Sequence, residues 1–130
     1  MQVTIYHNPR CGTSRTVLAT IRAAGIEPEV IDYLARPLSR EALTALFAKT
    51  GRPVRDLLRR NGTPYDELGL DDPALSDAAL IEAVARHPIL MNRPIVSSER
   101  GAALCRPPET VAGLLPEAAP VPLAIHEDRK

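Results

Sequence analysis

The decisive stretch of this sequence is residues 3–15, which read VTIYHNPRCGTSR. Its first part is the short apolar run of a buried strand, which predicts a strand over residues 2–6. Cys11 follows in the next loop, and residues 13–24 then carry apolar side chains three and four positions apart, the spacing of a helix. The stretch therefore predicts a cysteine at a junction between a strand and a helix.

A thiol at such a junction lies where the backbone N–H groups of the helix point outward and the helix dipole favours negative charge. This environment lowers a thiol pKa and supplies the nucleophilic thiolate near neutral pH. His7 and Arg15 lie close in sequence and add positive charge, while Asn8 and Ser14 add polar groups to the same loop. We therefore predict that Cys11 is a reactive thiol in an active-site loop.

The residues around Cys11 argue against two classes of thiol enzyme, the dithiol oxidoreductases and the cysteine phosphatases. Ser14 stands where dithiol oxidoreductases have a second cysteine, so an external thiol must regenerate the protein. We also expect the Ser14 hydroxyl to donate a hydrogen bond to the Cys11 sulfur. Position 17 is Val17, whereas a cysteine phosphatase has an arginine six residues after its cysteine. Two interpretations of His7 stay open, because it either supports the thiolate and accepts a proton or hydrogen-bonds the loop and holds its shape.

The composition fits one globular domain in a reducing compartment. The chain has 130 residues, of which 45% are hydrophobic, enough for a core, and its 16 Lys and Arg balance 16 Asp and Glu. No overall field therefore attracts nucleic acid or an anionic membrane, and no signal peptide or membrane-spanning run is visible. With two cysteines there is no disulfide framework, and we expect a cytoplasmic protein without a metal site. Cys105, in a predicted strand, is interpreted as a core side chain, with a resolving thiol as the lesser alternative.

The next elements follow from periodicity and helix caps. Residues 29–33 read as a second strand, which makes a strand-helix-strand unit with a parallel pair. Residues about 38–88 show only helical patterns, with a helix capped by Ser39, a short helical piece over residues 54–60, and a helix capped by Ser76. We interpret this region as a helical insertion.

The sheet resumes late in the chain. Residues 93–97 and 102–106 predict an antiparallel hairpin, and a last helix follows from Pro107. The order βαβ, helical insertion, ββα is that of an α/β thioredoxin-like fold with a central mixed sheet. We predict one such domain over residues 1–115 and a flexible tail over residues 116–130.

Three arginines lie at the ends of predicted elements. Arg59 ends the short helix, Arg93 precedes Pro94 at the start of a strand, and Arg106 ends the next strand. In thioredoxin-like folds a cis-proline at the position of Pro94 faces the active thiol. Such ends converge on one rim of the sheet, where guanidinium groups bind a tetrahedral oxyanion through charge-assisted hydrogen bonds.

Taken together, four segments resemble the glutathione- and glutaredoxin-coupled arsenate reductases. They are residues 7–15 (HNPRCGTSR), 54–61 (VRDLLRRN), 87–96 (HPILMNRPIV) and 104–109 (LCRPPE). The resemblance runs from about residue 2 to residue 115. It implies arsenate as substrate, glutathione as co-substrate, glutaredoxin as partner and no tightly bound cofactor.

The same resemblance implies roles for single residues. The Cys11 thiolate attacks the arsenic of arsenate, and an oxygen leaves as water. Arg59, Arg93 and Arg106 match the three anion-binding arginines of the family, and His7 matches a histidine that supports the low thiol pKa. Glutathione then attacks the adduct, glutaredoxin supplies reducing equivalents, and arsenite is released.

Two other functions stay open at this point. The fold family includes transcription regulators that bind RNA polymerase and carry a Cys-x-x-Cys redox switch. Ser14 argues against that switch, and the three arginines argue for an anion site. The second alternative is a general glutathione-dependent thiol oxidoreductase, which would reduce mixed disulfides without arsenate.

Overall fold

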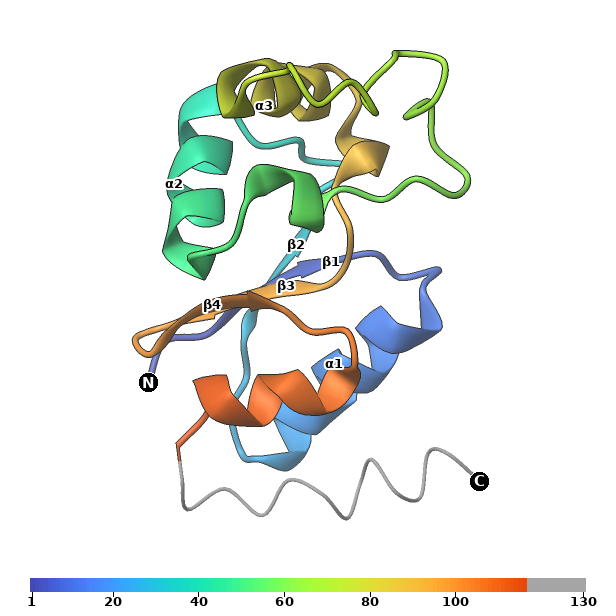
Figure 1. The fold of residues 1–130 in the computed structure, drawn as a ribbon. Helices are drawn as coiled ribbons and strands as arrows, with labels where there is room; N and C mark the ends of the chain where they lie inside the picture. The colour runs from blue at the N-terminus through green and yellow to red at the C-terminus, as the bar shows by residue number, and fades with distance from the viewer. Residues whose placement is uncertain (117–130) are drawn as a thin grey trace. The chain divides into compact units, whose positions relative to one another are not determined.

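The computed structural model of the chain describes residues 1–116, which divide into two compact units (Figure 1). Unit 1 comprises residues 1–32 and 93–116, and unit 2 is Tyr33–Asn92. The predicted domain boundaries at residues 1–115 and about 38–88 stay predictions. Apart from its first residue, the tail predicted at residues 116–130 lies outside the described residues.

Unit 1 is built on a four-stranded mixed sheet with the strand order β2-β1-β3-β4. Its strands are β1 (Thr4–His7), β2 (Glu29–Asp32), β3 (Ile95–Ser98) and β4 (Gly101–Leu104). β1 pairs in parallel with β2 and antiparallel with β3, and β3 and β4 form an antiparallel hairpin. This topology confirms the predicted α/β class and the thioredoxin-like fold, and the strand bounds lie within two residues of the predicted ones.

The helices α1 (Gly12–Ala23) and η3 (Pro108–Leu114) cover one face of this sheet (Figure 1). α1 buries Val17 and Ile21 in a core that includes side chains from the sheet and from η3. The predicted last helix is a 3₁₀ helix, in which side chains three residues apart share one side. Val111 and Leu114 have that spacing, and both are buried.

Unit 2 contains only helices and loops. Its elements are α2 (Arg40–Thr50), η1 (Val54–Leu57), α3 (Asp77–Arg86) and η2 (Pro88–Leu90). The predicted caps are confirmed, because Ser39 accepts the amide of Ala42 and Ser76 accepts the amide of Ala79, each at 3.1 Å. Within residues 1–116, no helix is both long enough and apolar enough to cross a membrane.

The prediction of a short helix over residues 54–60 was wrong at its end. η1 stops at Leu57, and Leu58 forms an antiparallel bridge with Met91. The Arg59 amide then donates to the carbonyl oxygen of Leu90 at 2.7 Å. Pairing with a segment about 30 residues away therefore overrides the local helical pattern, and Arg59 follows a bridge rather than ending a helix.

Candidate active site

Cys11 occupies the first position before α1, directly after the loop that follows β1. Its amide donates to the carbonyl oxygen of Asn8 at 3.0 Å, and its carbonyl oxygen accepts the amide of Arg15 at 3.0 Å. The residue is 9% exposed, so its side chain is largely covered. The backbone amide of Ser14, in the first turn of α1, favours the Cys11 thiolate, as the position at the junction predicted.

The charge state of Cys11 is set by opposing effects. Burial disfavours the thiolate, but the backbone amide of Ser14 and the guanidinium groups of Arg93 and Arg106 favour it, so the thiol pKa lies below its ordinary value. Nη1 of Arg106 lies 3.7 Å from the sulfur and also donates to the carbonyl oxygen of Arg93 at 3.1 Å. The Arg93–Pro94 peptide bond is cis. Two of the three predicted anion-binding arginines therefore lie at the nucleophile.

His7 and Ser14 form a buried polar pair inside the loop. The distance between His7 Nδ1 and Ser14 Oγ is 2.6 Å, and Ser14 Oγ also accepts the amide of Asn8 at 3.1 Å. Burial lowers the pKa of His7, although the Asp32 carboxylate opposes this effect, so the imidazole is neutral at neutral pH. The geometry favours the interpretation in which His7 holds the loop rather than the one in which it carries charge beside the thiolate.

This geometry contradicts the prediction that the Ser14 hydroxyl donates a hydrogen bond to the Cys11 sulfur. Among the described residues the hydroxyl has only His7 and Asn8 as partners, and it is the Ser14 backbone amide that favours the Cys11 thiolate. The physical reason is the position of Ser14 along α1. Ser14 is the third residue of α1, so its amide faces the residue before the helix while its side chain turns into unit 1.

Asn8 and Arg15 brace the backbone of the loop. Oδ1 of Asn8 accepts the amide of Arg10 at 3.0 Å, and Nη1 of Arg15 donates to the carbonyl oxygen of Pro9 at 2.9 Å. Asn8 is buried and Arg15 is exposed. Their predicted contact with substrate stays a prediction, whereas their contacts here hold the turn that presents Cys11.

Cys105 belongs to the core of unit 1. Its side chain is fully buried, and burial raises its pKa to about 12. A thiol in this environment stays protonated and is shielded from solvent, so it lacks the thiolate that exchange with a disulfide requires. The core interpretation is favoured over a resolving thiol.

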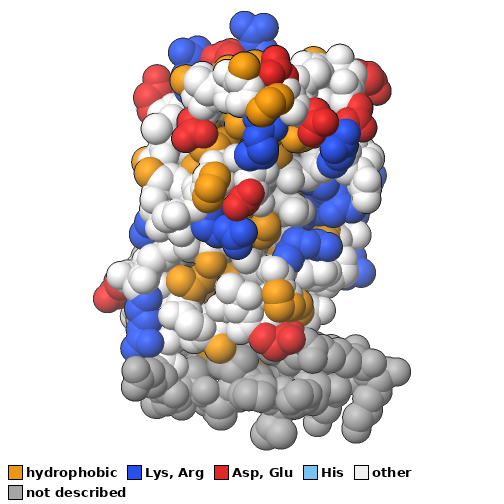
Figure 2. All heavy atoms as spheres, in the orientation of Figure 1, with side chains coloured by type: hydrophobic (Ala, Val, Ile, Leu, Met, Phe, Trp, Pro, Cys, Tyr) orange, Lys and Arg blue, Asp and Glu red, His pale blue; other side chains and the backbone are white. Residues whose placement is uncertain are grey.

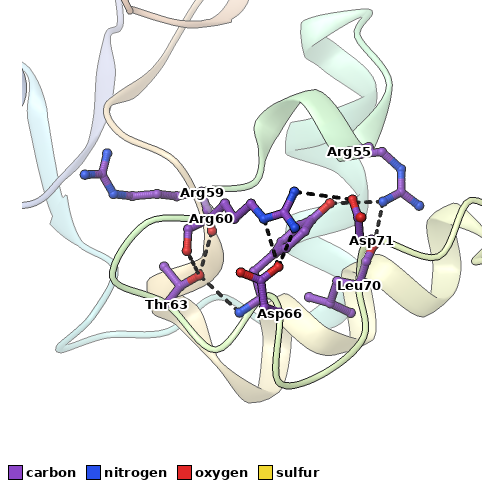
Figure 3. Close-up of polar contacts among 8 residues, drawn as sticks. Arg55, Arg59, Arg60, Thr63, Asp66, Leu70 and Asp71 are labelled. Carbon is purple, nitrogen blue, oxygen red and sulfur yellow. Dashed lines mark hydrogen bonds and ion pairs between the residues drawn. The ribbon is translucent and has the colours of Figure 1, made fainter.

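Arg59 lies in unit 2, and its backbone is fixed there. Thr63 Oγ1 donates to the carbonyl oxygen of Arg59 at 2.7 Å, and Nε of Arg59 donates to the carbonyl oxygen of Asn61 at 3.1 Å. The neighbouring Arg60 forms an ion pair with Asp66 at 2.6 Å. Figure 3 shows that the two arginine side chains run in opposite directions. The predicted role of Arg59 in binding an anion stays a prediction.

The sequence analysis did not identify Arg55 and Thr63, whose side chains hold the backbone near Arg59. Arg55 donates to the hydroxyl of Tyr65 at 3.1 Å and to the carbonyl oxygen of Asp72 at 2.9 Å. It also donates to the carbonyl oxygen of Leu70 (Figure 3). Together with Thr63 it ties the loop over residues 63–72 to η1. The only signal was that Arg55 falls in the segment 54–61, because its partners are mostly backbone carbonyls, which leave no mark on side-chain type.

The arrangement in unit 1 is suited to attack on an oxyanion. It combines a thiolate, two guanidinium groups at the sulfur and the open amides of a helix start. Donors and positive charges placed in this way stabilise negative charge on a bound oxyanion and on the adduct formed by the sulfur. Within residues 1–116, no cluster of three or more His, Cys, Asp or Glu side chains is arranged to hold a metal ion.

Comparison with known proteins agrees with this site. The model of the ArsC family matches residues 6–114. The arsenate reductase of Rhizobium meliloti (strain 1021) is 56% identical over 117 residues, which are 90% of this chain and 84% of that protein. That of Escherichia coli (strain K12) is 52% identical over 116 residues, 89% of this chain and 82% of that protein. The solved structure of the arsenate reductase from Vibrio cholerae has a TM-score of 0.85 and 46% identity, and covers 88% of this chain and 98% of its own. The chain belongs to the ArsC family.

Proposed function

We propose that this protein reduces arsenate to arsenite, with Cys11 as the nucleophile. The observation that carries the proposal is the Arg106 guanidinium 3.7 Å from the Cys11 sulfur, in a site that holds the thiol pKa below its ordinary value. Membership of the ArsC family and the arsenate reductases more than 50% identical to this chain support the same substrate.

The first step forms a bond between the Cys11 sulfur and arsenic. The thiolate supplies the electron pair, an arsenic–oxygen bond breaks, and the oxygen takes up protons and leaves as water. Arg93 and Arg106 hold the remaining oxygens and offset their negative charge. Arsenic is still pentavalent after this step, so two electrons remain to be supplied. Arg59 is the third anion-binding residue that the resemblance implies.

The electrons come from outside the chain. Ser14 stands in place of a second loop cysteine, and Cys105 is fully buried with a pKa raised to about 12. In the proposal glutathione attacks the arsenic adduct and glutaredoxin completes the reduction. Two external sulfurs end in a disulfide, arsenic takes up their electron pair, and arsenite is released with the Cys11 thiol restored. The cytoplasm is the proposed location, since these thiols must stay reduced there.

A coupled assay tests this function. The purified, reduced chain is mixed with arsenate, glutathione, glutaredoxin and glutathione reductase, and NADPH consumption is followed. We expect consumption that depends on arsenate and is abolished in Cys11→Ser but kept in the matched variant Cys105→Ser. Consumption driven by a mixed disulfide without arsenate indicates the general oxidoreductase instead. Activity with thioredoxin but not with glutaredoxin overturns the proposed reductant and leaves the arsenate chemistry standing.

A further inference from the structure

The active-site loop carries one arginine that the chemistry described above does not use. Residues 7–15 contain Arg10 and Arg15 and no carboxylate. Arg15 is engaged with the carbonyl oxygen of Pro9, and Arg93 and Arg106 act on the Cys11 sulfur. Arg10, which directly precedes Cys11, is exposed, and within residues 1–116 its side chain has no hydrogen bond or ion pair.

This state is uncommon among the arginines of the chain. Acidic and basic side chains are interspersed over much of the face shown in Figure 2. Arg22, Arg52 and Arg60, for example, pair with Glu27, Asp56 and Asp66. Among the described residues only Arg10, Arg36 and Arg100 have side chains with neither a hydrogen bond nor an ion pair, and Arg10 alone adjoins the nucleophile.

The backbone of Arg10 is fixed although its head group is not. Its amide donates to Oδ1 of Asn8 at 3.0 Å, and the amide of Cys11 closes the same turn on the carbonyl oxygen of Asn8 at 3.0 Å. Pro9 restricts the turn further through its ring. Only the Arg10 side chain remains to be ordered when a ligand binds, which keeps the entropic cost of binding low.

We propose that Arg10 binds the carboxylate of the small anionic thiol that attacks the adduct on Cys11. The inference rests on the proposed function, which requires a second thiol. Arg106 contacts the Cys11 sulfur and Arg93 favours its ionised form, whereas the exposed Arg10 side chain has no contact with the sulfur among the described residues, so we assign its guanidinium to the outer edge of the site rather than to the oxyanion at its centre. A peptide thiol such as glutathione, with carboxylates a few bonds from its sulfur, has the matching chemistry.

Alkylation of Cys11 provides a test that needs neither arsenate nor glutathione. Iodoacetate is anionic and iodoacetamide is neutral, so the ratio of their rates reports the field met by an incoming carboxylate and cancels changes in thiolate content. At low salt we expect Arg10→Ala to lower this ratio about threefold, the effect of one exposed charge acting over roughly 6–7 Å through water. Arg10→Lys is expected to retain most of the ratio.

Arg100→Ala is the matched control. Arg100 is exposed and lacks a side-chain partner among the described residues, and it lies at the opposite end of the sheet because β3 runs antiparallel to β1. Its loss is expected to leave the ratio unchanged. An unchanged ratio in Arg10→Ala, or an equal fall in Arg100→Ala, overturns the inference.

Turnover then identifies the ligand. With arsenate saturating, Arg10→Ala is expected to raise the KM for glutathione about threefold or more. The same substitution is expected to change the KM little when glutathione is replaced by its diester, which lacks both carboxylates. An equal loss with both thiols, or an unchanged KM for glutathione, overturns the inference. If the chain turns over no arsenate at all, the proposed function fails, while the alkylation ratio still reports on Arg10 separately.

Discussion

Replacing Arg106 with glutamine isolates the effect of its charge on Cys11. The guanidinium nitrogen lies 3.7 Å from the sulfur. Two unit charges at this distance interact by about 1 kcal/mol in water and about 4–5 kcal/mol at an effective dielectric constant of 20. Arg106 is exposed, so the value near the lower limit applies. Arg106→Gln is therefore expected to reduce the ratio of thiolate to thiol about fivefold at a given pH.

The assay is the rate of Cys11 alkylation by iodoacetamide as a function of pH. Because Arg106 lowers the pKa of Cys11, its loss moves the curve to higher pH. The rate on the acidic limb should fall about fivefold, and the plateau at alkaline pH should stay the same. Cys105 does not interfere, since it is fully buried.

Arg100→Gln serves as the control, because it removes the same charge from an exposed arginine with no side-chain partner among the described residues. The reasoning is refuted if Arg106→Gln alkylates along the wild-type curve. It is also refuted if Arg100→Gln shifts the curve equally, since the effect is then one of net charge and not of the contact with the sulfur.

Three further changes test the rest of the site. Cys105 has its pKa raised to about 12 in the folded protein, so between about pH 9 and 12 only the unfolded chain releases this proton, and stability falls as the pH rises. Between pH 8 and pH 10, the free energy of unfolding measured in urea should fall less in Cys105→Ala than in the wild type, by up to about 1.4 kcal/mol per pH unit. An equal fall in the two proteins contradicts this. Ser14→Ala leaves the buried partners of its hydroxyl unsatisfied and should lower the free energy of unfolding by about 1–3 kcal/mol, whereas an unchanged urea midpoint speaks against that role. Thr63→Val removes the hydrogen bond to the Arg59 carbonyl and should raise the KM for arsenate about fivefold, while Thr44→Val removes a similar bond in α2 without effect; equal kinetics in the two variants count against Arg59 as a substrate ligand.

Features governed by neighbouring residues were predictable from the sequence. Ser39 and Ser76 cap their helices, and Cys11 lies at a helix start, because each depends on a few adjacent residues. The end of η1 was not predictable, since it depends on pairing between Leu58 and Met91, far apart in the chain. In the same way, the sequence indicated Ser14 as a partner of the sulfur, but only the register of α1 decides that its amide and not its hydroxyl takes that role.

The order of the strands along the chain means that the groups around Cys11 are synthesised at different times. β3, which lies next to β1 in the sheet, is made only after unit 2, and Arg93 and Arg106 flank the hairpin that it begins. A nascent chain that has exposed Cys11 but not yet this hairpin carries the thiol without the two guanidinium groups that favour its ionised form. Until the last third of the polypeptide has joined the sheet, the sulfur therefore lacks two of the groups that favour its ionised form, and only the start of α1 is present to support that form.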